Sequence, residues 1–244
     1  SIESIFQSME LEDMLEDFLQ GGKYKKDTCL TDNNAEDVKK YFMENWNTVL
    51  RHYEGQSKWA KKYYQKVLNG CQKVAAVDVG WAGSGAAALD HMVNKVWKLD
   101  CEIYGLIAGT NSVYNQEPNG SEAFLFHKKM DSYMFSQSHN RDLWKMHNPG
   151  KGHNIIVELL LASDTCSLKS FDEAGPVFCR KREEIDSRQV QTGILDFIDD
   201  FLEKIKDIPP ISGRDAYAPI AVLLDNEEWV RKVLHTDTFK MNLE

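Results

Sequence analysis

Residues 73–92 read Lys73-Val-Ala-Ala-Val-Asp-Val-Gly-Trp-Ala-Gly-Ser-Gly-Ala-Ala-Ala-Leu-Asp-His-Met92. The first part is a short apolar run rich in β-branched residues, the middle holds three glycines, and the end is rich in alanine. This pattern predicts a buried strand over 73–79, a glycine-rich turn and a helix over 84–97. A second apolar run over 101–108 predicts another strand, and a strand–helix–strand unit places its two strands parallel to each other.

The first seventy residues are predicted to be helical throughout. Apolar residues recur there at helical spacing, and Gly21-Gly22 and Gly55 mark the ends of the first two predicted helices. Ser57 is a candidate N-cap for a third helix. We therefore predict a helical segment over 1–70, followed by an α/β domain over 71–244.

The rest of the chain is predicted to hold short strands and helices. The predicted elements are a strand over 122–127, a helix over 131–147, a helix rather than a strand over 153–162, a hairpin over 167–171 and 176–180, a helix over 188–206 and two short helical stretches around Leu223 and Val230. The fold class that follows is α/β, a Rossmann-like parallel sheet with an N-terminal helical segment and a C-terminal helical cap.

The composition narrows the classes of partner. The 244 residues carry a formal net charge of −9, whereas nucleic acid and anionic membrane surfaces attract basic proteins. No apolar stretch approaches the roughly 18 to 20 residues that cross a bilayer, and the first residues do not resemble a secretory signal. We expect small molecules or proteins as partners, with no nucleic acid and no membrane span.

The cysteines indicate a reducing compartment. Their number is five, and no two of them form a C-x-x-C pair. This usage is typical of free thiols in a cytoplasmic protein, so we expect a cytoplasmic location and no structural zinc site. Because the chain starts at Ser1 and enters a helical pattern at once, we also expect that it is a piece of a longer protein. An upstream domain of that protein is then a further expected partner.

The glycine-rich turn is a candidate anion site. Gly80, Gly83 and Gly85 permit close approach of a ligand to the backbone, and Ser84 can cap the following helix, whose free amides favour a phosphate. The spacing matches neither the dinucleotide pattern G-x-G-x-x-G nor the P-loop. Ser84 also lacks the G-x-S-x-G setting of a hydrolase nucleophile, so we expect a helix cap rather than a triad.

For two side chains of this segment, Asp78 and Trp81, the sequence leaves two interpretations open. Asp78, near the carboxyl end of the strand, either binds a hydroxyl or a metal ion or braces the glycine turn. Trp81 either stacks on a base or sugar at the strand end or fills the core beneath the neighbouring helix.

Further candidates lie outside the segment. Thr110 and Asn111 follow the second strand, where they either contact a ligand at the same sheet edge or cap a loop. Glu158 lies in an apolar stretch, where it is either a catalytic carboxylate or half of a buried ion pair with Arg180 or Arg182. Four histidines in the middle of the chain match no zinc signature, although one of them is expected near the ligand. They are His127, His139, His147 and His153.

Three segments carry a resemblance to a known family. They are Val77-Asp-Val-Gly-Trp-Ala-Gly-Ser84, then Asn154-Ile-Ile-Val-Glu-Leu-Leu-Leu-Ala-Ser163 with Ser167-Leu168 following, and Val190-Gln-Thr-Gly-Ile-Leu-Asp-Phe-Ile198. Together they resemble the C-terminal region of bacterial surface-polysaccharide-biosynthesis proteins that carry an N-terminal haloacid-dehalogenase-like domain. The resemblance covers roughly residues 40–240 and implies a setting in capsule or lipopolysaccharide assembly. The dehalogenase-like signature D-x-D-x-[TV] is missing around Asp78, so we expect no phosphatase activity from this chain alone.

The leading hypothesis is a glycosyltransferase-like module that binds a nucleotide or a nucleotide sugar. In this scheme the amides of Gly83–Gly85 hold a diphosphate, Trp81 stacks on the ligand, Asp78 meets a hydroxyl or Mg²⁺, and Glu158 is a base. One alternative is a noncatalytic scaffold whose acidic helices dock a companion domain, and an exposed apolar patch on the first helix would favour it. Another is a phosphoryl-handling hydrolase that requires an upstream dehalogenase-like domain.

Overall fold

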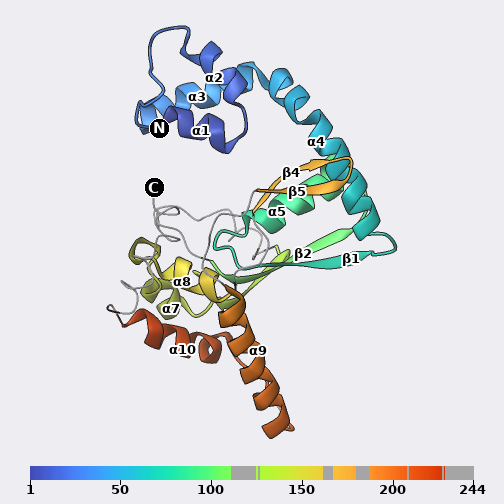
Figure 1. The fold of residues 1–244 in the computed structure, drawn as a ribbon, viewed down its shortest axis with the longest axis vertical. Coiled ribbons are helices and arrows are strands. Elements are labelled where there is room, and N and C mark those ends of the chain that lie inside the picture. Colours follow the sequence, from blue (N-terminus) through green and yellow to red (C-terminus); the bar gives the residue numbers. More distant parts are fainter. Residues whose placement is uncertain are drawn as a thin grey trace. The chain divides into compact units, whose positions relative to one another are not determined.

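The computed structural model describes residues 1–110, 125, 127–161, 167–179, 187–207, 209–226 and 228. They form a mixed α/β protein that divides into two units (Figure 1). The first unit comprises residues 1–63 with 170–177, and the second comprises 64–169 with 178–244. The division therefore falls within a helix, a few residues before the boundary expected at residue 70.

The first unit contains α1 (Ile2–Ser8), α2 (Glu12–Leu19), α3 (Asp32–Glu44) and most of α4 (Trp46–Val67), so the predicted helical segment is observed. The α3 helix starts with a capping box, in which the Thr31 hydroxyl accepts from the Asn34 N–H and the Asn34 amide oxygen accepts from the Thr31 N–H. The apolar faces of these helices meet in one buried cluster. It consists of Ile2, Phe6, Leu11, Met14, Leu15, Val38, Phe42 and Val49.

The predicted helix boundary near Gly55 is wrong. The chain breaks instead at Asn45, whose side-chain amide donates to the Tyr41 carbonyl at the end of α3. The α4 helix then runs through Gly55 without interruption. A single glycine weakens a helix by only about 1 kcal/mol, which the packing of a 22-residue amphipathic helix outweighs.

The sheet of the second unit has three parallel strands in the order β1 (Lys73–Asp78), β2 (Glu102–Gly109) and β3 (Met130–Phe135). The predicted helix after β1 is α5 (Ser84–His91), which continues as a π-helical turn over Met92–Val96. One face of the sheet packs on α5, where Ala86, Ile107 and Met130 form a buried cluster. The other face exposes 81 % of Val77 and 40 % of Leu106. Among the described residues, no second helical layer covers these two side chains as in a doubly wound sheet, and no residue of β1 is fully buried, so the prediction of a buried strand is wrong.

Residues 130–135 correct the prediction of a helix over 131–147. They form β3, because Met130 pairs with Gly105 of β2 and its side chain enters the cluster beneath α5. Only the later part is helical, as α7 (Arg141–Met146). The strand predicted over 122–127 lies largely outside the described residues.

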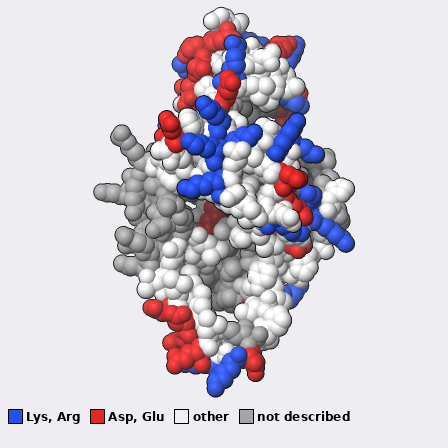
Figure 2. All heavy atoms as spheres, turned by 90° about the vertical axis from the view of Figure 1, so that its right-hand side faces the viewer, with Lys and Arg blue, Asp and Glu red and all other residues white. Residues whose placement is uncertain are grey.

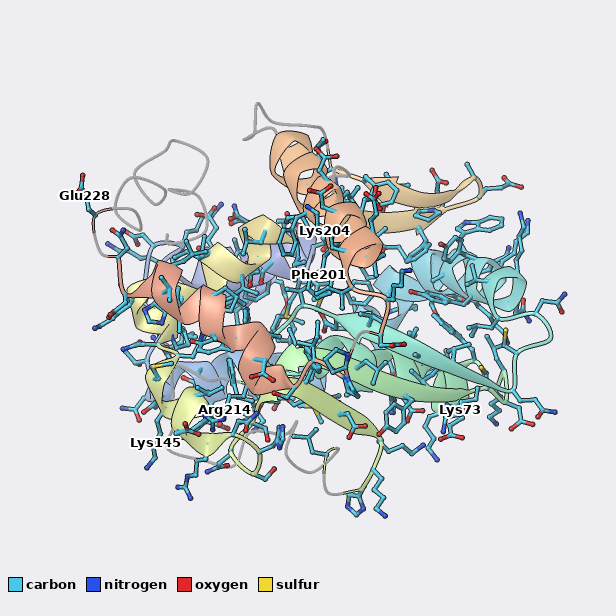
Figure 3. The ribbon with its side chains drawn as sticks, turned by 90° about the horizontal axis from the view of Figure 1, so that it is seen from below. Lys73, Lys145, Phe201, Lys204, Arg214 and Glu228 are labelled. Carbon is cyan, nitrogen blue, oxygen red and sulfur yellow. The ribbon has the colours of Figure 1, made fainter. Side chains whose placement is uncertain are left out.

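The elements after the sheet follow the prediction more closely. They are a 3₁₀ turn over Pro149–Lys151, α8 (His153–Leu160), the hairpin of β4 (Leu168–Asp172) and β5 (Gly175–Phe178), α9 (Ser187–Lys204) and α10 (Gly213–Leu224). The helical stretch predicted around Val230 lies outside the described residues. Arg214 at the start of α10 makes a bidentate ion pair with Asp142 of α7, the helix that carries Lys145 (Figure 3).

A hydrophobic core of the second unit lies at the carboxyl end of the sheet. Its buried members come from the glycine turn, β3, α7, α8 and α10, and they are Trp81, Met134, Phe135, Leu143, Ile156, Val157, Tyr217 and Leu224. By contrast, α9 leaves apolar side chains in solvent, among them Leu195 and Phe197, which are 60 % and 67 % exposed. No helix among the described residues is both long and apolar enough to cross a membrane.

Candidate functional site

The candidate site begins with Asp78, the last residue of β1. Its half-buried carboxylate accepts a hydrogen bond of 2.7 Å from the Gly80 N–H. A Cβ at Gly80 would stand 2.9 Å from both carboxylate oxygens, and a Cβ at Gly85 would stand 3.1 Å from Oδ2. A Cβ at position 80 would therefore force the Asp78 carboxylate out of its hydrogen-bonded position, which favours glycine there.

The turn continues into α5 without a side-chain cap. Gly83 is the N-cap residue and adopts a left-handed conformation with φ of +65°, which favours glycine. Ser84 is already the first helical residue and is exposed, so the prediction that Ser84 caps the helix is wrong. The negative charge at this helix end is supplied by Asp78, whose Oδ2 lies near Gly85.

This placement changes the electrostatics of the predicted anion site. A phosphate at the first turn of α5 would lie beside the Asp78 carboxylate, and like charges at that distance repel each other. Oδ2 has no hydrogen-bond donor among the described residues. The arrangement therefore suits a ligand hydroxyl that donates to Asp78, or a cation between the carboxylate and a phosphate.

Trp81 lies in the core, in agreement with the interpretation that it fills the core rather than stacks on a ligand. Only 8 % of the residue is exposed, and its ring stacks on His147 and Phe135 at centroid distances of 4.8 Å and 6.2 Å. The indole N–H donates to Glu158 Oε1 at 2.9 Å. Too little of the ring is accessible for a base to stack on it, which corrects the stacking role expected for Trp81.

Glu158 lies on the exposed side of α8, while Ile155, Ile156 and Val157 are buried. Its observed partner is the Trp81 indole, and the expected partners Arg180 and Arg182 lie outside the described residues. The structure thus brings Glu158 to the glycine turn, with Trp81 between α8 and the backbone that follows Asp78.

The described end of β2 does not offer the ligand contact that was expected from Thr110. Thr110 is fully buried, and its N–H donates to the Phe135 carbonyl at 2.9 Å, which extends the pairing of β2 with β3. Asn111 lies outside the described residues. The described sheet edge therefore presents the Asp78 turn, while the Thr110 backbone belongs to the core.

A buried polar network was not predicted as such. His147 is only 2 % exposed, and its Nδ1 and Nε2 lie 2.9 Å from the Tyr217 hydroxyl and from Asn154 Oδ1 respectively. Because the amide oxygen accepts, the imidazole carries its proton on Nε2, and Nδ1 accepts from the phenol. His153 lies against the His147 ring, and its Nδ1 accepts from the Asn148 N–H at 3.0 Å.

Burial dominates the titration of this network. It lowers the pKa of His147 to about 4, although the hydrogen bond with Asn154 acts in the opposite direction. It also lowers the pKa of His153 and raises that of the Tyr217 hydroxyl. Both histidines are therefore neutral packing elements near neutral pH. The dipeptide His-Asn occurs at 147–148 and 153–154 but also at 139–140, where His139 is exposed, so it does not single out the two buried histidines.

In the described part of the chain, no three His, Cys, Asp or Glu side chains come close enough to hold a metal ion by themselves. Comparisons of the chain with protein-family models, with curated proteins and with solved structures gave no match.

Proposed function

We propose that the chain binds a nucleotide or nucleotide sugar at the carboxyl end of β1, as a glycosyltransferase-like module of bacterial surface-polysaccharide assembly. The observation that carries the proposal is the half-exposed Asp78 carboxylate, which the Gly80 N–H holds beside the first turn of α5. Open parallel sheets bind ligands at this edge. The order β1-β2-β3 supports a Rossmann-like fold, since each half of that fold has three consecutive parallel strands.

Asp78 is the proposed ligand contact. A carboxylate accepts well from sugar hydroxyls, and a diphosphate beside it requires a cation to offset the like charge. Mg²⁺ fits this chemistry because it commonly binds through one or two carboxylates together with substrate phosphates. Asp78 would hold the ion, and the backbone of Gly83–Gly85 would face the phosphates.

Glu158 is the proposed general base of this module, because its carboxylate is exposed and joined to the turn through Trp81. Trp81 acts in the proposal as a positioning residue, which fixes Glu158 relative to the backbone after Asp78.

The proposed setting is the cytoplasm, without nucleic acid as a partner. The four described cysteines are free thiols, which a reducing compartment favours. Lysine and arginine side chains lie next to acidic ones on the face drawn in Figure 2, and the whole chain has a net charge of −9. Lys58 and Lys62 of α4 lie over the ring of Trp59, with Nζ atoms 4.9 Å and 5.2 Å from its centre.

Calorimetric titration with nucleoside diphosphates and nucleotide sugars, with and without Mg²⁺, tests the proposal. In Asp78→Asn the amide oxygen still accepts from Gly80, while the charge is lost, so we expect the best ligand to bind about tenfold more weakly. Asp172→Asn is the matched control, because Asp172 braces the hairpin turn in the same manner, accepting from the Ala174 and Gly175 N–H groups. The proposal would be refuted if none of these ligands binds, or if Asp78→Asn and Asp172→Asn lose the same affinity.

One observation favours the alternative of a noncatalytic module that docks a companion dehalogenase-like domain. Leu195 and Phe197 are largely exposed on α9, which Figure 3 shows with Phe201 and Lys204. The first helix, by contrast, buries Ile2 and Phe6, so it does not offer the apolar patch that this alternative predicted for it. Co-sedimentation with such a domain, abolished by Phe197→Glu and retained in Asp78→Asn, would favour docking over ligand binding.

A further inference from the structure

The third strand contains a bulge close to its carboxyl end. Ile107 of β2 pairs with Ser132 of β3, and Gly109 pairs with Phe135, so two steps along β2 correspond to three along β3. The Ser132 hydroxyl donates to the Phe135 carbonyl, which also accepts from the Thr110 N–H. Bulges redirect side chains and are frequent beside functional sites. Here the bulge bends the strand next to a hollow.

The hollow has a volume of about 330 Å³, which is at the lower end of the range for small-molecule sites. Buried Met130 forms an apolar part of its wall. The polar part comes from the bulged strand and from the loop that follows it, and it consists of Asp131, Ser132, Ser136, Ser138 and His139.

The loop after β3 is held in place by Ser136. This residue is only 1 % exposed, and its hydroxyl oxygen accepts from the N–H groups of Ser138 and His139 at 3.2 Å and 2.9 Å. It also lies 3.1 Å from the Ser138 hydroxyl. Two hydroxyl groups are thereby placed at the wall by hydrogen bonds within the loop, so little ordering is required when a ligand binds.

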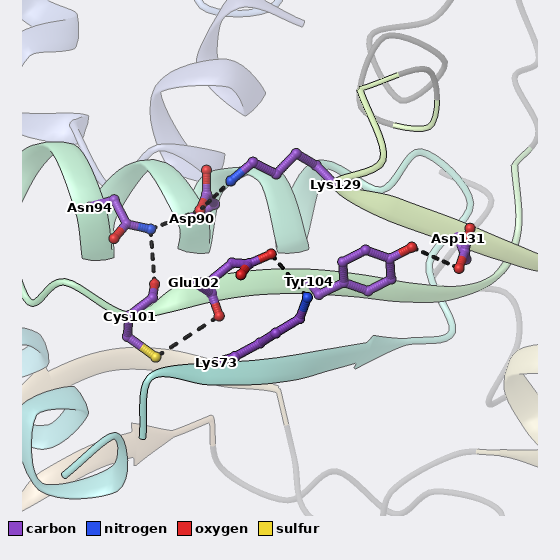
Figure 4. Close-up of polar contacts among 8 residues, drawn as sticks. All are labelled: Lys73, Asp90, Asn94, Cys101, Glu102, Tyr104, Lys129 and Asp131. Atoms are coloured by element: carbon purple, nitrogen blue, oxygen red, sulfur yellow. Dashed lines mark hydrogen bonds and ion pairs between the residues drawn. The ribbon is translucent and has the colours of Figure 1, made fainter. Parts of the chain in front are cut away.

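The two ionisable groups of the wall are also fixed by neighbours. The Asp131 carboxylate accepts from the Tyr104 hydroxyl at 2.7 Å (Figure 4). The exposed His139 ring places Nε2 3.2 Å from the Asn140 side-chain nitrogen, which donates, so the ring proton lies on Nδ1.

These groups select the chemical class of the ligand. An anion would meet the Asp131 carboxylate, and neither lysine nor arginine is among the lining residues that the structure describes. A neutral sugar offers hydroxyls that donate to the exposed Asp131 carboxylate and exchange hydrogen bonds with the exposed His139, without placing a second charge beside Asp131. We propose that this hollow binds a single neutral sugar ring.

The proposal stands on the geometry of the hollow, and only its relevance to polysaccharide assembly rests on the proposed function. Saturation-transfer NMR of the full chain with glucose, galactose and N-acetylglucosamine tests it. We expect transfer to at least one sugar, and a dissociation constant roughly three- to tenfold larger in His139→Ala, as for the loss of one hydrogen bond. Asp131→Asn keeps an acceptor for Tyr104 and is expected to weaken binding as well.

His91→Ala is the control, because His91 is an exposed histidine at the end of α5 and does not line the hollow. Asp78→Asn separates the two proposals, since it is expected to weaken nucleotide-sugar binding and leave the binding of free sugars unchanged. No transfer to any of the three sugars overturns the proposal, and so does transfer that His139→Ala and Asp131→Asn leave unchanged. Loss of nucleotide-sugar binding with retained sugar binding would contradict the proposed function alone.

Discussion

The contact between α10 and β3 yields the sharpest test of the packing. Gly213 begins α10, and a Cβ at this position would stand 1.8 Å from the Tyr133 carbonyl oxygen and 2.7 Å from its carbonyl carbon. Both atoms belong to the strand backbone, so no side-chain rotation relieves the clash. Gly213→Ala must move α10 away from β3, and with it the fully buried Tyr217.

The expected cost follows from this geometry. Overpacking of a core costs about 1–3 kcal/mol when side chains can adjust, so we expect about 3 kcal/mol or more where only backbone can move. For a domain of this size that corresponds to a melting temperature lower by roughly 6–12 °C. Differential scanning calorimetry measures the change directly.

The matched control is Gly193→Ala in the interior of α9. A Cβ there meets no atom within 4 Å, so alanine is expected to stabilise the helix by up to about 1 kcal/mol. Equal melting temperatures for Gly213→Ala and the parent protein would refute the close approach of α10 to β3. They would also remove the basis for the position of Tyr217 against Phe135.

Three further predictions concern the core beside the glycine turn. The pKa of His147 is about 4 in the folded protein and near 6.5 when unfolded, so the unfolded state binds the proton first, and stability falls by about 3 kcal/mol as the pH drops from 6.5 to 4. Urea denaturation at pH 7 and pH 4.5 should show a smaller difference in His147→Gln, and an unchanged difference would contradict the assignment. Tyr217→Phe leaves Nδ1 of His147 without its donor, and we expect a loss of about 1–3 kcal/mol in the same assay, whereas a neutral effect would mean that another donor replaces the phenol. Trp81→Phe removes the indole N–H that binds Glu158, which is expected to cost about 1–2 kcal/mol in thermal unfolding, and a stability equal to that of the parent would show that the bond contributes nothing.

Local patterns in the sequence predicted several elements correctly, although not the helix boundary near Gly55. The alternation of apolar residues and glycines identified β1, α5 and β2, and the apolar periodicity of α9 identified a helix over nearly its whole length. The same kind of pattern gave a wrong prediction for residues 130–135, which form a strand rather than part of a helix. Their strand is specified by pairing with Gly105, far away in the chain, while their own composition is compatible with a helix.

The candidate site shows the same division. The bracing of the glycine turn by Asp78, one of its two interpretations, could be predicted from residues close together in the sequence. The burial of Trp81 could not be predicted in this way, because its hydrogen-bond partner is 77 residues away and its stacking partners come from β3 and the segment before α8. The prediction that Ser84 caps the helix is wrong for a different reason, because a left-handed Gly83 moves the start of the helix by one residue.

The hydrogen bond from Trp81 to Glu158 makes the glycine turn and α8 thermodynamically dependent on each other. A ligand at Asp78 that shifts the turn by altering this bond would change the stability of α8. By reciprocity, a substitution on α8 that alters the bond changes the affinity at Asp78 by the same free energy. If a ligand binds at Asp78 as proposed, substitutions on a helix about eighty residues later in the chain change its affinity without touching the ligand.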